Sequence, residues 1–185
     1  MKPSIIGVVL IAGLFAIAAG WIYQSLSTSL VTRPALDIPS DIDYFMTDFT
    51  YRVIDKTGNL DYQFQSRYLE HYTEDDVSRI EAPVLLVYET NDHWRVEAVI
   101  GELYHRSNTM QLSDNVVMQK MGSDPMLVRS ENILFEPDRD LFVADQGLVI
   151  ESPNALIAAD EAVFDLHNQV YKLKNTKAVY YDENS

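Results

Sequence analysis

The sequence lacks cysteine, so it forms no disulfide bonds and offers a metal no thiolate ligand. It is also poor in positive charge, with 14 Lys and Arg against 28 Asp and Glu and a formal net charge of -14. A phosphate backbone would be repelled by this charge, which argues against nucleic-acid binding. The 185 residues are 47% hydrophobic, enough to build one domain with a core and an appendage.

Charged residues are absent between Lys2 and Arg33, and within this interval Ile5 to Tyr23 is a 19-residue apolar run. A helix rising about 1.5 Å per residue would span roughly the 30 Å hydrocarbon core of a bilayer. The pattern predicts a cytoplasmic N-terminus at residues 1–4, a transmembrane helix at 5–23 and a Ser/Thr-rich tether at 24–40. The remainder, residues 41–185, is predicted to be an exported domain.

A secretory signal cleaved near Ala16-Ile17-Ala18 is the alternative to an anchor, but the apolar run is long and the basic region short for one. Ala12, Ala16 and Gly20 lie at i, i+4 and i+8 of the expected helix. Such a stripe of small residues lets another membrane helix approach, so these three are candidate partner-binding residues, although small residues are also common in membrane spans.

A helical period is missing after residue 40, and turn signals recur throughout this part of the sequence. Apolar residues alternate with polar ones, as in Leu60 to Tyr68, and again in Trp94 to Ile100. The region is therefore predicted to be all-β, with one wet face and one dry face.

A short pattern repeats within the domain: Leu112-Ser113-Asp114 is echoed by Val143-Ala144-Asp145 and by Leu173-Lys174-Asn175. From Asp114 to Asp145 is 31 residues, and from Asp145 to Asn175 is 30. Each copy has an apolar run on both sides, which predicts stacked β-hairpins that bury their apolar faces against one another. A sandwich with similar turns by chance is the alternative.

Catalytic and metal-binding motifs are also missing. The four histidines lie far apart in the sequence, and neither a nucleophile elbow nor a phosphate-binding glycine loop occurs. The acidic pairs Asp75-Asp76 and Asp138/Asp140 sit in turn signals, where solvated side chains are more common than acid–base couples. We therefore expect no enzyme, no metal site and no cofactor.

Five segments together resemble the lipopolysaccharide export protein family LptC, and the resemblance runs over nearly the whole chain. None is a catalytic signature, so the resemblance rests on their order and spacing. The segment Leu112 to Val116 differs from the family, because it has Asp114 where glycine usually precedes Asn-Val. The segments are Tyr68 to Tyr72, Glu81 to Tyr88, Trp94 to Gly101, Leu112 to Val116 and Val170 to Asn175.

The resemblance implies an open, V-shaped β-jellyroll with an apolar groove, preceded by one transmembrane helix in the cell inner membrane. It implies that the periplasmic domain takes lipopolysaccharide from an inner-membrane ABC transporter and passes it to a periplasmic bridge protein of the same fold. Proteins of this family are not enzymes. The alternatives are a membrane-anchored structural adaptor with a closed core, and a hydrolase, which would need two carboxylates converging in a cleft.

Candidate lipid-binding residues are those that the alternation places on an apolar face. They are Tyr62, Phe64, Trp94, Val96, Met110, Leu112, Phe135, Val143, Leu148 and Phe164.

Candidate partner-binding residues at the C-terminal edge are Tyr171, Leu173, Val179 and Tyr180. We expect Val170 to Lys174 and Lys177 to Tyr181 to form a final hairpin whose edge pairs with the bridge protein. Three lysines (Lys172, Lys174 and Lys177) would keep this edge from aggregating, steer an acidic partner, or do both at once.

Overall fold

The structure is a computed structural model, which describes residues 41–89, 92–122 and 124–181. These residues belong to one compact unit, and their strands form a single 14-stranded antiparallel sheet. The predicted all-β class is confirmed. The only helical element described is one short 3-10 turn, η1 (Pro137–Arg139), and no helix among these residues is long and apolar enough to cross a membrane.

The strands alternate apolar and polar residues, which is why they can bury one face and expose the other. The burial of β5 (His93–Glu97) follows this rule, because Trp94 and Val96 have no exposed surface. The other strands are β1 (Ile42–Ile54), β2 (Leu60–Tyr72), β3 (Val77–Glu81), β4 (Val84–Tyr88), β6 (Ile100–Tyr104), β7 (Thr109–Met121), β8 (Met126–Glu136), β9 (Leu141–Ala144), β10 (Leu148–Ser152), β11 (Ala155–Ala159), β12 (Glu161–Asp165), β13 (Val170–Lys174) and β14 (Lys177–Tyr180).

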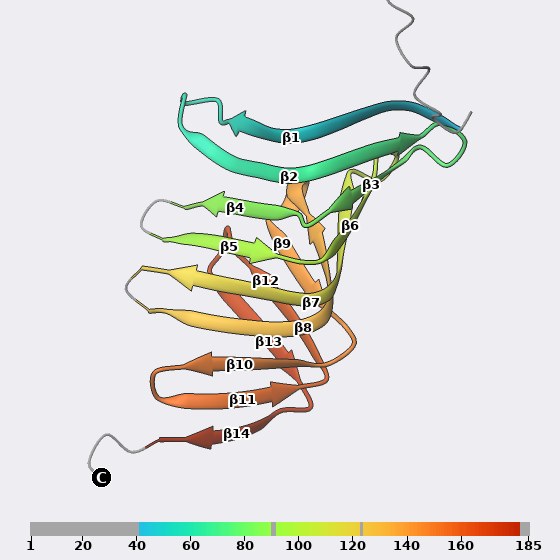
Figure 1. The fold of residues 1–185 in the computed structure, drawn as a ribbon. Coiled ribbons are helices and arrows are strands. Elements are labelled where there is room, and N and C mark those ends of the chain that lie inside the picture. The colour runs from blue at the N-terminus through green and yellow to red at the C-terminus, as the bar shows by residue number, and fades with distance from the viewer. Residues whose placement is uncertain (1–40, 90–91, 123, 182–185) are drawn as a thin grey trace, which may run out of the picture. The chain divides into compact units, whose positions relative to one another are not determined.

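The sheet consists of two half-sheets that share their long strands. In the first half-sheet, β4 and β5 lie between β2 and β7, and β10, β11 and β14 follow β8 (Figure 1). In the second, β3 and β6 lie between β2 and β7, and β9, β12 and β13 follow β8. Four strands, β1, β2, β7 and β8, run through both half-sheets.

The two half-sheets face each other and bury a common core. Trp94 of the first half-sheet packs against Phe164 of the second, with ring centroids 6.2 Å apart. Val96 and Met118 from the first half-sheet and Phe142 from the second belong to the same cluster, all without exposed surface. This shared core holds the half-sheets together by apolar burial, since either half-sheet alone would expose its apolar face to water.

A line of corners joins the half-sheets, and at each corner the chain passes from one to the other. The repeat found in the sequence marks these corners: Asp114 lies inside β7, Asp145 between β9 and β10, and Asn175 between β13 and β14. Asp114 and Asn175 have φ angles of 63° and 55°, the left-handed conformation that Asp and Asn tolerate best. The prediction that these positions are hairpin turns was therefore wrong, because the hairpin turns lie between successive corners.

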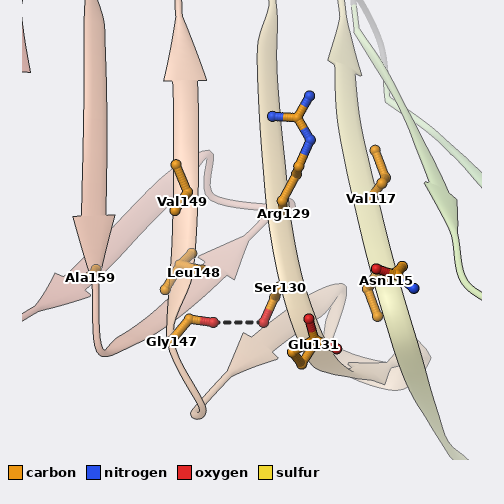
Figure 2. Close-up of a pocket in the computed structure, with 10 residues that line it drawn as sticks. Asn115, Val117, Arg129, Ser130, Glu131, Gly147, Leu148, Val149 and Ala159 are labelled. Atoms are coloured by element: carbon orange, nitrogen blue, oxygen red, sulfur yellow. Dashed lines mark hydrogen bonds between the residues drawn. The ribbon is translucent and has the colours of Figure 1, made fainter.

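Two serines stabilise the corners in the same way. The Ser66 hydroxyl lies 2.6 Å from the carbonyl oxygen of Glu81 in the neighbouring corner, and that of Ser130 lies 2.8 Å from the carbonyl oxygen of Gly147 (Figure 2). Each hydroxyl donates to a backbone carbonyl of the next corner, so a side chain links two successive corners. A hollow of about 610 Å³ lies beside Ser130, where Gly147 carries no side chain to fill it (Figure 2).

Candidate functional site: an apolar groove beside β1

An apolar groove of about 430 Å³ lies at the β1 end of the sheet, between the two half-sheets. Its volume is within the usual range for ligand pockets, about 300–1,000 Å³. Aromatic and aliphatic side chains make up most of its wall, so it suits an apolar ligand. The lining residues are Tyr44, Met46, Phe49, Thr50, Tyr51, Tyr62, Phe64, Leu69, Ser78, Leu85, Leu103, His105, Asn108, Met110, Phe135 and Pro137.

One wall of the groove is β1, an edge strand that pairs only with β2 among the described strands. Its large side chains remain partly in water, and Tyr51 is 56% exposed. Phe49 packs on Phe64 of β2, with ring centroids 5.7 Å apart. An edge strand with exposed aromatic residues provides a solvent-exposed rim for an apolar ligand, and its outer main-chain groups can pair with a partner strand.

The sequence pattern did not predict the groove residues of β1, because the alternation of apolar residues changes frame within this strand. Tyr44 and Met46 line the groove, and so do Phe49 and Tyr51. The second pair lies an odd number of residues after the first, so a regular strand would have placed it on the opposite face. Asp48, between the two pairs, has a φ of 46°, and this left-handed residue switches the face to which the following side chains point. The sequence does carry a sign of this change of face, since two short alternating runs meet at Asp48.

A polar cluster borders the groove where β1 begins. The Nδ1 atom of His71 lies 2.6 Å from Oδ1 of Asp43, and the His71 ring stacks on Tyr44 at 4.6 Å. Hydrogen bonding to His71 lowers the pKa of Asp43 below its ordinary value of 3.8. Both contacts tie β1 to β2, so His71 stabilises the wall of the groove.

Ser78 and His105 form a second pair in this cluster, with the serine Oγ 2.8 Å from Nε2 of His105. A serine, a histidine and an aspartate are the groups of a hydrolase triad, but here the aspartate bonds to a different histidine, His71. Ser78 also has no exposed surface, so its hydroxyl is not presented to a substrate. The arrangement supports a structural role for these polar groups.

The groove ends at a packed middle section of the interior. Phe135 stacks on Phe142 at 4.6 Å, and Tyr62 meets Phe135 edge to face at 6.4 Å. Beyond them, Trp94 and Phe164 fill the space between the half-sheets. The interior is therefore open at the β1 end and filled in its middle.

The ten predicted lipid-binding residues fall into three groups. Tyr62, Phe64, Met110 and Phe135 line the groove. A second group belongs to the packed core: Trp94, Val96, Leu112, Leu148 and Phe164. The third is Val143.

The placement of Val143 on the inner face was wrong. Phe142 and Ala144 are buried in the core, whereas Val143 between them is only partly buried and faces the other way. The η1 turn that precedes β9 sets this frame, with Asp140 in the left-handed conformation at its end.

The predicted C-terminal partner residues divide between two strands that do not pair with each other. β13 pairs with β12 in the second half-sheet, whereas β14 pairs with β11 in the first, so the predicted final hairpin is wrong. Tyr171 and Leu173 of β13 pack against the core, while Val179 and Tyr180 of β14 are 58% and 77% exposed. Two separate edge strands, β13 and β14, therefore end the two half-sheets among the described strands.

Lys174 is engaged within the sheet, since its Nζ lies 2.6 Å from Oε1 of Glu161. The other partner residues predicted from the sequence, Ala12, Ala16 and Gly20, lie outside the described residues. So do the predicted transmembrane helix at 5–23 and the tether at 24–40.

An antiparallel sheet that folds over on itself, with an apolar groove at one end and the edge strands β13 and β14 at the other among the described strands, defines a β-jellyroll-like protein. The family described as "LptC: Lipopolysaccharide-assembly, LptC-related" matches residues 8–182, and the chain belongs to this family. Membership implies a role in lipopolysaccharide transport. No curated protein matches the sequence.

Proposed function

We propose that this protein accepts lipopolysaccharide from an inner-membrane ABC transporter and passes it to a periplasmic bridge protein of the same fold. Residues 5–23 anchor the chain in the inner membrane with the N-terminus in the cytoplasm, and residues 41–185 form the periplasmic domain. The groove beside β1 is the observation that carries the proposal, because an acyl chain needs an apolar space that the protein's own side chains leave open.

The net charge of -14 bears on how an anionic glycolipid would be held. Phosphate groups are repelled by such a surface, so the acyl chains supply the attraction. Burying about a dozen methylenes contributes roughly 10 kcal/mol at about 0.8 kcal/mol each, which makes release into water very slow. A carrier with this affinity can hand its lipid only to another apolar groove, which favours a continuous bridge.

The C-terminal edges suit the second step of the proposal. A partner of the same fold would add one strand to β14 and another to β13, since these strands end separate half-sheets. Main-chain pairing at both edges would continue the interior into the partner. The exposed Val179 and Tyr180 would then be covered by the added strand.

A structural adaptor with a closed core is the second candidate, and the packed middle section around Trp94 favours it. An adaptor would use the same two edges but would bind no lipid. Capture of lipid in the groove therefore separates the two functions.

The test uses photo-crosslinking side chains placed in the full-length protein, in membranes that contain the transporter. Crosslinkers at Met46 and Tyr51, which line the groove, should capture lipopolysaccharide only when ATP is supplied. Arg67 is the control, since it is exposed on β2 and does not line the groove. Equal capture at Arg67 would refute the groove assignment, and no capture at any position would favour the adaptor.

A chain that ends at Thr176 extends the same test to the hand-over. It lacks β14 but retains β13, so the first half-sheet loses the edge on which a partner strand would pair. Capture at Tyr51 should persist, while co-purification of the bridge protein should be lost. Full recovery of the bridge protein would place the docking edge elsewhere.

A further inference from the structure

The packed middle of the interior stands between the groove and the C-terminal edges. Phe135 and Phe142 end the groove, and Trp94, Phe164 and Tyr171 fill the space that follows. A lipid that enters beside β1 cannot pass these side chains as they are packed. Conduction therefore requires the two half-sheets to separate here, or the lipid never reaches β13 and β14.

The side of the interior opposite the corners is closed by side chains. We call this closure the seam, formed by Glu89, Asp92, Lys120, Gln169 and Tyr171. Glu89 follows β4 and Asp92 precedes β5, whereas Gln169 and Tyr171 lie at the start of β13. The seam therefore brings together residues of the two half-sheets that are about eighty residues apart in sequence.

A hydrogen bond crosses the seam at its rim, where Nε2 of Gln169 lies 3.3 Å from Oε2 of Glu89. Deeper inside, Lys120 is held by Asp92 at 3.0 Å, and both side chains are almost fully buried. The Lys120 ammonium also lies 5.9 Å from the centre of the Tyr171 ring, which belongs to the opposite half-sheet. The seam thus combines one exposed polar contact with a buried ion pair that faces an aromatic ring.

The contacts across the seam differ from those at the corners. At the corners, the backbone continues from one half-sheet to the other and backbone hydrogen bonds join successive corners, as from Val99 to Asp114. Across the seam, the contacts between the described residues are made by side chains alone, and the backbone ladders stay within each half-sheet. Side-chain contacts can separate and re-form without breaking a ladder, whereas the corners cannot.

We propose that the seam is a gate, which parts while the corners act as the hinge and so lets lipid pass from the groove to the C-terminal edges. The gate rests on the function proposed above. The Lys120–Asp92 pair stays within the first half-sheet when the gate opens, because both residues belong to it. Opening therefore separates the Glu89–Gln169 hydrogen bond and withdraws the Tyr171 ring from Lys120 and Trp94.

The test locks the gate in the full-length protein. The chain has no cysteine, so the pair Glu89→Cys and Gln169→Cys can be joined by a short bis-maleimide that contains a reducible bond. Photo-crosslinkers report the lipid on both sides of the gate. Tyr51 lies in the groove, and Ile157 of β11 packs against the core toward the C-terminal edges. The matched control joins Arg129→Cys to Glu151→Cys, an ion pair within the first half-sheet.

With the gate locked, capture of lipopolysaccharide at Tyr51 should be unchanged and capture at Ile157 should fall at least tenfold. Reduction of the crosslinker should restore capture at Ile157, and the control pair should have no effect on either position. Unchanged capture at Ile157 in the locked protein would overturn the gate while leaving the groove in place. Absence of capture at Tyr51 in the unlocked protein would instead overturn the function on which the gate rests.

Discussion

The groove beside β1 and the packed middle are built from the same strands and corners, yet only the first leaves space for a ligand. In the groove, β1 presents Tyr51 and Met46 to a side of the sheet that is partly open to water. In the middle, Trp94 of the first half-sheet and Phe164 of the second reach each other and exclude water. The backbone fold thus sets where an interior can exist, and side-chain size decides whether it is filled.

This difference is testable first as a difference in stability. Trp94→Ala should lower the free energy of unfolding by about 3–5 kcal/mol, because it removes a fully buried ring and leaves a cavity. Tyr51→Ala, in a residue 56% exposed, should cost about 1 kcal/mol or less. Urea unfolding of the purified protein measures both. Equal losses would mean that the groove is packed as tightly as the middle.

Removing the serine hydroxyl should destabilise the corners of both regions by a similar amount, because the two serines make the same kind of hydrogen bond. Ser66 lies near the groove, and Ser130 lies near the C-terminal half of the sheet. Replacing either serine with alanine should cost about 1–3 kcal/mol, because a carbonyl loses its hydroxyl donor in a partly buried site. The exposed Ser107 is the control, and Ser107→Ala should change stability by less than about 0.5 kcal/mol. A much smaller loss for one corner would show that the two corners are not equivalent.

The sequence was sufficient to predict the all-β class, because the alternation in β2 and β5 is a local property of the chain. It was also sufficient to find the repeat, since Asp and Asn recur where the backbone turns left-handed, as at Asp114 and Asn175. Whether such a residue closes a hairpin or bends a strand into the facing half-sheet depends on which strands pair. Pairing is a long-range property that local pattern does not contain.

The candidate site was predictable only in part for the same reason. Tyr62, Phe64, Met110 and Phe135 were found because each lies in an alternating run. Alternation distinguishes inner from outer faces, but it does not say what stands opposite an inward residue. Trp94 was therefore grouped with Phe64, although the facing Phe164 fills the space around it.

The smallest expected effect is a pH dependence of opposite sign in the two regions. Asp43, beside the groove, has its pKa lowered chiefly by the hydrogen bond to His71. A depressed pKa in the folded state contributes stability above the ordinary value of 3.8, and this is lost as the pH falls through the folded value. Asp43→Asn should therefore make stability less sensitive to acid below about pH 4.

Glu89, at the seam, has its pKa raised chiefly by burial, although the hydrogen bond from Gln169 opposes the shift. For an acid whose folded pKa lies above its unfolded value, stability increases as the pH falls through the folded value, since the folded state then binds the extra proton. Glu89→Gln should abolish this increase and leave the variant no less stable than the parent at neutral pH. Urea midpoints recorded between about pH 3 and pH 7 compare both variants with the parent. Slopes of the same sign at the two positions would mean that the seam carboxyl is solvated like the one beside the groove, and that the middle is more open than its packing indicates.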